Sequence, residues 1–299
     1  MKGRRGPDLP TIAMISDFGT WDAYTGIMKG VISSIAPSAR IIDLSHEVQP
    51  GDVRSAAFML WQAAPFMPRG TIFLAVVDPD VGTERRAIAV SFSRFTFVGP
   101  DNGLFTYLSL RDAEYRGVRI ASTEPGLPGA GSTFHGRDVF APAAAHLAAG
   151  LPITALGVEV EGFARLPLPR LESLPEGRLR GEVLRADRFG NLVTSIGFLR
   201  TREDSIHYES WLAPRKRYSA SRTQYPASRD AEYSFKTAAS LRARLSGGAE
   251  IPFRRTYGEV PPGEPLAYIG SDGLLEIAVN KGNAAAELSV FMGMEVSLH

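Results

Sequence analysis

The sequence predicts an α/β protein, with a central, mainly parallel sheet flanked by helices and a smaller β-domain after it. Three observations lead to this prediction. In the first half, apolar runs of strand length alternate with segments whose apolar residues recur at helical spacing, which is typical of a parallel sheet covered by helices. A proline-rich stretch follows. Beyond it, short apolar runs are separated by glycine turns, which favours a small β-domain.

The elements of the first half follow from this alternation. Residues 11–16 (TIAMIS) are a mostly apolar run, and apolar residues between 27 and 35 then recur on one helix face. Residues 53–66 form a second helical pattern with a face of small residues. The expected elements are strands at 11–16, 39–44, 71–77, 87–92 and 95–98, and helices at 27–35, 53–66, 104–111 and 139–149.

A domain boundary is expected where the chain becomes rich in proline. The stretch RLPLPRLESLPEG (165–177) has little periodic pattern, as an interdomain linker does. Strands are expected at 181–186 and 191–196, joined by the turn DRFG, whereas 199–246 is irregular and suggests a surface insertion. The expected ranges are an N-terminal α/β domain over 1–170, a linker over 171–180 and a C-terminal β-domain over 181–299.

Composition excludes several classes of protein. The chain has 33 basic and 32 acidic side chains, so its formal charge of +1 creates no global field for nucleic acid or anionic lipid. The absence of cysteine excludes disulfides, thiolate metal sites and cysteine nucleophiles. The apolar run after the basic N-terminus is too short for a signal peptide, and no run approaches the roughly 18 apolar residues of a membrane span. These features predict a soluble, cytoplasmic protein.

The first candidate cluster is SDFGTWD, which follows the first expected strand. Open parallel sheets bind ligands beyond the carboxyl ends of their strands, so polar residues there carry weight. Asp17 can accept hydrogen bonds from both hydroxyls of a ribose, and Asp22 can pair with an ammonium group. The structural alternative, with Asp22 as a helix N-cap and Asp17 as a loop acid, fits the pattern equally well.

The second cluster is VDPDVGTERR, which lies between two apolar runs. Asp78 follows a strand directly, and Pro79, Gly82 and Thr83 favour a turn. A turn that reverses the chain can bring Arg85 to Asp78 as a charge pair. An exposed ion pair in a loop contributes little, and on this pattern alone that structural interpretation is favoured.

The third cluster is TFHGRD, placed just before the apolar helix VFAPAAAHLAAG. His135 can act as a general base because the reference pKa of histidine lies near neutrality. Alternatively, Asp138 caps the helix and His135 is a polar residue with satisfied hydrogen bonds, as a single histidine more often is.

Two turns of the second half carry further candidates. Asp187, Phe189 and Asn191 lie in DRFGN, where an acid, a stacking aromatic ring and an amide can face a purine. Ser271 lies in GSDG and can belong to a ligand loop. On pattern alone, both segments are turns first, since glycine and asparagine tolerate positive φ.

Other signatures are absent or weak. The sequence has no HExxH, P-loop or GxSxG motif, and GLPGAG (126–131) lacks the flanking strand and helix of a dinucleotide fold. Arginines and aromatic residues interleave between 200 and 222, as in some nucleic-acid surfaces, but at this net charge a solvated basic loop is favoured. No nucleic-acid partner and no membrane association are expected.

Taken together, SDFGTWD, VDPDVGTERR, GPDNG, TFHGRD, DRFGN and GSDGLLEIAVNKGNAA resemble one family, in the same order along the chain. It is the S-adenosyl-L-methionine (SAM) hydroxide adenosyltransferases, adenosine-forming SAM hydrolases related to fluorinase and chlorinase. The resemblance runs from about residue 11 to near the C-terminus and is weakest over 200–258. It implies an N-terminal α/β domain, a C-terminal β-barrel-like domain, and a homotrimer that holds SAM where neighbouring subunits meet.

The resemblance also implies a role for each candidate. Asp78, Arg85 and His135 match the set found in the hydroxide-using members, in which water attacks C5′ of SAM and releases adenosine and L-methionine. No metal or cofactor is expected, and SAM is the substrate. The implied substrate-binding residues are Asp17 for the ribose hydroxyls, Asp22, Asp187 and Ser271 for the methionine end, and Phe189 and Asn191 for the adenine.

The halogenases of the same family are the main alternative. They carry a tyrosine at the position of Asp78, and fluorinase has a serine at that of Gly136, so this chain lacks both features of a halide site. Tyr24 and Asp272 replace a serine and an arginine of fluorinase, which leaves the contacts to methionine open. A SAM- or adenosine-binding protein without catalysis has the same motifs, and only activity separates it from an enzyme.

Overall fold

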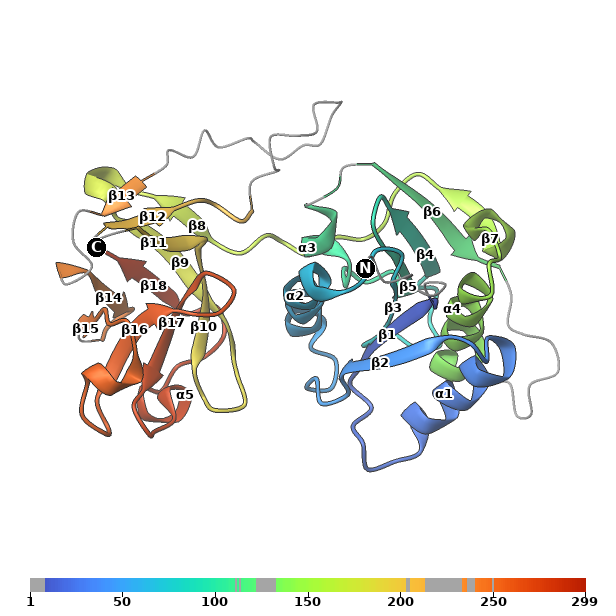
Figure 1. Cartoon of the computed structure of the whole chain (residues 1–299), viewed down its shortest axis with the longest axis horizontal. Coiled ribbons are helices and arrows are strands. Elements are labelled where there is room, and N and C mark those ends of the chain that lie inside the picture. Colours follow the sequence, from blue (N-terminus) through green and yellow to red (C-terminus); the bar gives the residue numbers. More distant parts are fainter. Residues whose placement is uncertain are drawn as a thin grey trace, which may run out of the picture. The chain divides into compact units, whose positions relative to one another are not determined.

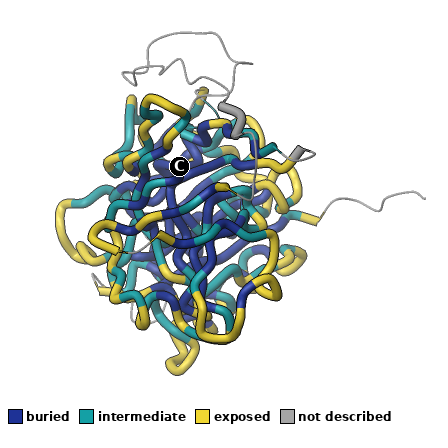
Figure 2. Tube along the Cα trace, turned by 90° about the vertical axis from the view of Figure 1, so that its left-hand side faces the viewer, coloured by how far each residue is buried: buried dark blue, intermediate teal, exposed yellow. Residues whose placement is uncertain are grey.

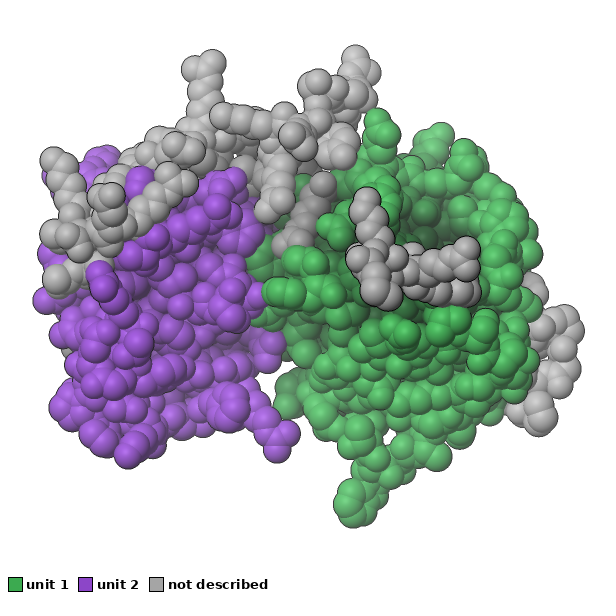
Figure 3. Space-filling model, viewed as in Figure 1, with its two compact units in different colours: residues 1–166 green, residues 167–299 purple. Residues whose placement is uncertain are grey.

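The computed structural model describes residues 9–110, 112, 114–121, 133–202, 205–212, 233–235, 240–248 and 250–299. Contacts within the chain divide it into two compact units, residues 1–166 and residues 167–299 (Figure 3). The domain ranges expected from the sequence, 1–170, 171–180 and 181–299, remain a prediction. The GLPGAG stretch and the basic residues Arg215, Lys216, Arg217 and Arg222 lie outside the described part of the chain.

The first unit contains a seven-stranded sheet with helices on both faces (Figure 1). Its strands are β1 (Thr11–Ser16), β2 (Arg40–Ser45), β3 (Ile72–Val76), β4 (Ala87–Phe92), β5 (Thr96–Pro100), β6 (Tyr115–Ile120) and β7 (Gly157–Val160). Its helices are α1 (Tyr24–Ile35), α2 (Val53–Ala63), α3 (Thr106–Ser109) and α4 (Ala141–Ala148), with short helical turns η1 (Ala64–Phe66), η2 (Gly136–Phe140) and η3 (Ile153–Leu156).

The strand order of this sheet is β2-β1-β3-β5-β4-β6-β7. β1 pairs in parallel with β2 and β3, and β3 pairs in parallel with β5. The pairs from β5 to β7 are antiparallel. For β4 and β5 the reason is that only three residues join them, too few for a parallel crossover. The α/β fold class is confirmed, with parallel pairing confined to one half of the sheet.

The central strands are buried on both faces, which explains their continuous apolar runs. Ile12 and Met14 of β1 pack with α1 and α4, whereas Ala13 and Ile15 pack with α2 on the other face. α2 begins at a side-chain cap, in which Asp52 accepts a hydrogen bond from the backbone N–H of Ser55 at 2.9 Å. In Figure 2, buried residues (dark blue) lie in the interior and exposed residues (yellow) lie mostly in the outer loops. Within the described residues, no helix has the length and apolar character needed to cross a membrane.

The second unit is built almost entirely of strands (Figure 1). They are β8 (Leu171–Ser173), β9 (Leu179–Ala186), β10 (Leu192–Gly197), β11 (Leu199–Arg202), β12 (Ser205–Tyr208), β13 (Tyr233–Phe235), β14 (Arg242–Leu245), β15 (Glu250–Pro252), β16 (Pro265–Ile269), β17 (Leu274–Val279) and β18 (Glu295–Leu298). Between them lie η4 (Pro175–Gly177), η6 (Tyr257–Glu259) and α5 (Ala284–Glu287).

Seven of these strands form an antiparallel sheet in the order β15-β14-β18-β9-β10-β17-β16, with β8 added at β9. The sheet nearly closes on itself, because Phe253, just after β15, bridges to Ala267 of β16. The expected β-barrel-like fold is therefore confirmed. The expected linker, 171–180, contains β8 and the first residues of β9, and Leu179 is completely buried in the barrel core. The expected irregular segment contains a small sheet of β11, β12 and β13.

Candidate active site

The turn in VDPDVGTERR folds the chain back on itself after β3. The backbone N–H and the hydroxyl of Thr83 both donate to the carbonyl oxygen of Asp80, at 3.2 and 2.8 Å. Gly82 has φ +82°, a conformation that the third residue of such a turn needs and that glycine adopts without strain. The hydroxyl of Thr83 then accepts from the N–H of Arg85 at 3.3 Å. This turn returns Arg85 to the end of β3.

Asp78 and Arg85 form a bidentate ion pair. The Nε of Arg85 donates to Oδ1 of Asp78 at 2.8 Å, and its Nη2 donates to Oδ2. The two side chains are only 5% and 7% exposed, so this is not the surface ion pair that the pattern alone favoured. Because a buried pair is shielded from water, its geometry is held firmly and loss of one partner is costly.

His135 completes a group that we call the polar trio, with Asp78 and Arg85. The Nη2 of Arg85 lies 2.7 Å from Nδ1 of His135. Arginine has donors only, so Nδ1 accepts this hydrogen bond and the neutral ring carries its proton on Nε2. The ring of Phe140 lies 5.2 Å from the Arg85 guanidinium and packs edge-on to His135.

Burial lowers the pKa of His135 below its ordinary value of 6.5, and the positive charge of Arg85 lowers it further. The negative charges of Asp78 and Asp138 act in the opposite direction but do not cancel the effect. The ring is therefore neutral at pH 7. A proton on Nδ1 would face the guanidinium and break the hydrogen bond with Arg85.

This lowered pKa predicts a pH dependence of stability. Between the folded pKa and 6.5 the unfolded chain binds more protons at this residue, so the free energy of unfolding falls as pH falls below 6.5. Above pH 6.5 this residue does not change the free energy of unfolding with pH. Urea unfolding should show that the free energy of unfolding falls less between pH 7.5 and pH 5.5 in His135→Asn than in the wild type. The side-chain oxygen of asparagine can still accept from Arg85. Equal losses in both proteins would contradict the lowered pKa of His135.

Residues of the motif GPDNG form hydrogen bonds with the neighbours of Asp78 and Arg85. The side-chain amide of Asn102 donates to the carbonyl oxygen of Val77, the residue before Asp78, at 2.8 Å. Arg86, next to Arg85, donates from Nε to Asp101 at 2.7 Å. These contacts fix both ends of the turn. This motif was part of the family resemblance, but no role was predicted for it.

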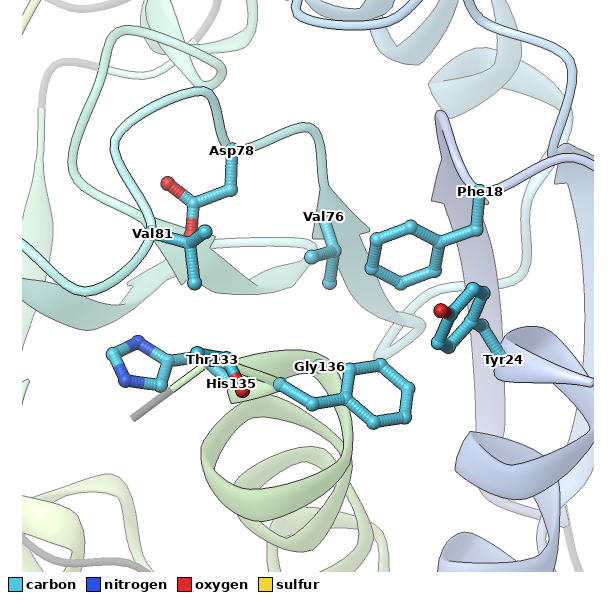
Figure 4. A pocket seen from close by; sticks show the side chains of 9 residues that line it. Phe18, Tyr24, Val76, Asp78, Val81, Thr133, His135 and Gly136 are labelled. Atoms are coloured by element: carbon cyan, nitrogen blue, oxygen red, sulfur yellow. The ribbon is translucent and has the colours of Figure 1, made fainter. Parts of the chain in front are cut away.

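The trio lies beside a cavity of about 280 Å³. β1 and β3 are in register with Ser16 opposite Val76, which places their following loops together, and η2 packs against α1 and β3. In Figure 4, Asp78 and His135 lie at one end of the cavity, with Phe18 and Tyr24 at the other. The lining residues are Phe18, Tyr24, Val76, Asp78, Val81, Thr133, Phe134, His135 and Gly136.

Asp17 and Asp22 lie in the loop that follows β1. The Oδ2 of Asp17 accepts from the N–H of Gly51 at 2.9 Å, which holds the carboxylate at the edge of the sheet. His46 anchors the same loop, because its carbonyl accepts from Gly19 and its ring bonds to the hydroxyl of Ser16, both at 2.7 Å. Asp22 is exposed and is not the N-cap of α1, which is Ala23. The capping interpretation of Asp22 is therefore wrong.

The candidates of the second unit lie in two turns. The Oδ1 of Asp187 accepts from the N–H groups of Phe189 and Asn191, both at 2.8 Å, and its Oδ2 accepts from the Asn191 amide at 2.9 Å. The carboxylate thus organises a turn that leaves the ring of Phe189 75% exposed. Ser271 lies in the turn between β16 and β17, closed by the N–H of Gly273 on the carbonyl of Gly270 at 3.0 Å.

Acidic side chains lie near both turns. Burial raises the pKa of Glu276 on β17, and the charges of Asp187 and Asp272 raise it further, against a lowering by Tyr268 and Arg185. Carboxylates such as Asp187 and Asp272 can pair with an ammonium group. Within the described residues, no group of three histidine, aspartate or glutamate side chains is arranged to hold a metal ion.

The sequence did not identify the aromatic side of the cavity. Phe18 and Phe134 belong to motifs that were singled out for their neighbours Asp17 and His135, and Tyr24 was noted only as a departure from fluorinase. The available signal was an aromatic residue directly beside Asp17 and directly beside His135. Only packing shows that these rings meet.

The chain matches one family in both of its halves. Residues 12–157 match the SAM hydroxide adenosyltransferase N-terminal domain, and residues 223–297 match the C-terminal domain. The sequence is 44% identical to a Thermus thermophilus protein named (R)-S-adenosyl-L-methionine hydrolase, over 96% of this chain and 98% of that one. It is 28% identical to a fluorinase of Actinopolyspora mzabensis, over 96% of each chain.

Solved structures agree with these matches. The crystal structure of a conserved protein from Thermotoga maritima superposes with a TM-score of 0.77 at 33% identity, covering 96% of this chain and 99% of that one. A conserved hypothetical protein from Thermus thermophilus gives a TM-score of 0.71 at 40% identity, covering 97% and 100%. With the motifs, the fold and both domain matches in agreement, the chain belongs to the SAM hydroxide adenosyltransferase family.

Proposed function

We propose that this protein hydrolyses SAM to adenosine and L-methionine, by in-line attack of water on C5′. The observation that carries the proposal is the buried polar trio at one end of a cavity, in a chain of this family. The relative from Thermus thermophilus is named for the (R) form of SAM. Because the methionine and ribose centres are fixed, that descriptor refers to the sulfonium sulfur, and we propose the (R) form as substrate.

In the proposed reaction a C–O bond forms at C5′ while the C5′–S bond breaks, and its electron pair stays on sulfur to give a neutral thioether. The attacking water must lose a proton. The lone pair of Nδ1 in His135 is already engaged by Arg85, whereas each oxygen of Asp78 accepts one hydrogen bond from Arg85 and has room for another. We therefore assign proton acceptance to Asp78, and to His135 the Nε2–H group, which can donate to the water and orient it.

Arg85 holds the other two members of the trio in place and keeps positive charge beside the developing hydroxide. A protonated alcohol is a far stronger acid than a carboxylic acid, so a carboxylate paired with arginine is still basic enough to accept the proton. Alignment of the water with the C5′–S bond also selects C5′ over the less hindered methyl carbon. SAM is the substrate, and no cofactor enters this scheme.

Substrate binding is proposed for loops of both units. Asp17, one residue beyond β1, accepts the ribose hydroxyls, and the exposed ring of Phe189 stacks on adenine beside Asn191. Asp22, Asp187 and Ser271 bind the methionine end, where the carboxylates of Asp22 and Asp187 can pair with the ammonium group. A homotrimer with SAM at the subunit interfaces and a cytoplasmic location complete the proposal.

Halogenation is the second candidate, since fluorinases are more distant relatives. Two observations weigh against it. The carboxylate of Asp78 at the cavity repels a halide. A Cβ atom at Gly136 would lie 3.0 Å from the sulfur of Met28 and from the ring of Phe134, and 3.2 Å from that of Phe18, so a serine there would require these side chains to move.

The test is product analysis with the full-length protein, using (R)- and (S)-SAM separately in ¹⁸O-labelled water with chloride present. We expect adenosine and methionine from the (R) form, with one ¹⁸O in the adenosine 5′-hydroxyl and none in methionine. Appearance of 5′-chloro-5′-deoxyadenosine would favour a halogenase instead. Tight binding of SAM without any product would indicate a binding protein that has lost catalysis.

A further inference from the structure

We infer that Phe18, Tyr24 and Phe134, the aromatic end of the cavity, bind the sulfonium cation of the substrate through their ring faces, and that Tyr24 sets the preference for a sulfonium over a neutral thioether. This inference rests on the proposed function and deepens it. Its ligand is a trialkylsulfonium group, and its chemistry is cation–π attraction.

The three rings form one cluster. The centroid of Tyr24 lies 5.8 Å from that of Phe18 and 5.2 Å from that of Phe134, and Phe18 and Phe134 are 5.8 Å apart. The rings come from the loop after β1, from the first residue of α1 and from the residue before His135. Tyr24 is 46% exposed, so the cluster is open to the cavity and is not a closed piece of core.

In-line chemistry determines where the sulfur must lie. Water, C5′ and sulfur are collinear in the displacement, with water on one side of the carbon and sulfur on the other. Water at the Asp78 and His135 end therefore directs the sulfonium toward the opposite end, where Figure 4 shows Phe18 and Tyr24. Val76 and Gly136 lie between the two ends, and neither side chain brings charge there.

Among the described residues, no unpaired carboxylate lines the cavity, so the aromatic rings are the groups that can stabilise the cation. Asp78 supplies the carboxylate among the described lining residues, and Arg85 neutralises it. Phe134 already has the guanidinium of Arg137 5.4 Å from its centroid, and that charge is balanced by Asp138. No cation of the described residues lies over Phe18 or Tyr24, and Tyr24 is the more readily changed because it is exposed.

The cation disappears as the C5′–S bond breaks, so the aromatic end binds the starting state more strongly than the transition state. Interactions of that kind lower KM without raising kcat. They also weaken as soon as the neutral thioether forms, which favours release of methionine. The expected signature is therefore a change in affinity that depends on the charge of the ligand, with kcat unchanged or raised.

The test compares Tyr24→Leu and Tyr24→Phe with the wild type, using (R)-SAM as substrate and S-adenosyl-L-homocysteine, the neutral thioether, as competitive inhibitor. Tyr24→Leu should raise KM for SAM by about 3- to 30-fold and leave the inhibitor Ki within about twofold. Tyr24→Phe should keep the ratio of Ki to KM. Phe66→Leu, an exposed ring on η1 that does not line the cavity, is the matched control and should change neither constant.

An equal rise of KM and Ki in Tyr24→Leu would overturn the inference, because it would indicate apolar packing without sensitivity to charge. A fall in kcat with unchanged KM would overturn it as well. If the wild type releases no adenosine from SAM, the proposed function fails by itself. The same ratio, taken from dissociation constants measured by calorimetry, then still tests the aromatic end.

Discussion

Replacement of Asp78 by asparagine is expected to lower kcat for SAM hydrolysis by about 10²- to 10⁴-fold, the usual effect of losing a general base. The amide keeps the shape of the side chain but cannot accept the proton of water. It also leaves Arg85 buried without its counter-charge, so the free energy of unfolding should fall by about 3–5 kcal/mol. Single-turnover release of adenosine measures the rate, and urea unfolding measures the stability.

Asp80→Asn is the matched control for this variant. Asp80 lies two residues further on, in the same turn, but is exposed, and its backbone carbonyl rather than its side chain accepts from Thr83. We expect its kcat and stability to stay close to those of the wild type. If Asp78→Asn, assayed at a temperature where it is folded, retained the rate of Asp80→Asn, Asp78 would not be the proton acceptor.

Replacement of Arg85 by lysine is expected to lower kcat by about 10²- to 10³-fold while SAM still binds within a few-fold. Lysine keeps the positive charge beside Asp78, so the buried carboxylate stays paired. It cannot donate from a planar fork to both oxygens of Asp78 and also to Nδ1 of His135, which are the contacts that orient the trio. Arg85 is absent from the cavity lining among the described residues, so binding should change little.

Arg86→Lys is the matched control for Arg85→Lys, because it makes the same substitution at the next residue. Arg86 pairs with Asp101 and with the carbonyl of Gly162, away from His135. Its replacement should affect kcat only weakly. Measurement of SAM affinity by calorimetry and of adenosine release in a single turnover separates binding from chemistry. Equal rates for the two lysine variants would show that the geometry around Arg85 does not limit the reaction.

Short-range patterns predicted most elements of the first unit. β1 and β4 begin and end at the expected residues, because buried strands bounded by turns produce continuous apolar runs. The same patterns do not show strand direction. β4 runs antiparallel to β5 because only three residues connect them. β8 forms within the proline-rich stretch, where Leu171 and Leu179 pack into the barrel core.

The candidate site was predicted in parts. The family and the residues Asp78, Arg85 and His135 could be named from the motifs, since each motif stands directly beside a strand or helix end. Burial of the ion pair could not be predicted, because exposure depends on η2 and GPDNG, which lie far away in the sequence. The tautomer of His135 likewise depends on a contact between residues 50 positions apart.

The sequence by itself determined the fold class, the order of the motifs and the residue types available for water activation. The tertiary structure alone decided which of those residues meet, which proton position His135 adopts, and that Phe18, Tyr24 and Phe134 form the opposite end of the cavity. The physical reason is the distance along the chain over which each effect acts. Periodicity and turn chemistry act over a few residues, whereas a cavity is made where side chains from separate elements pack, and their packing depends on the whole unit.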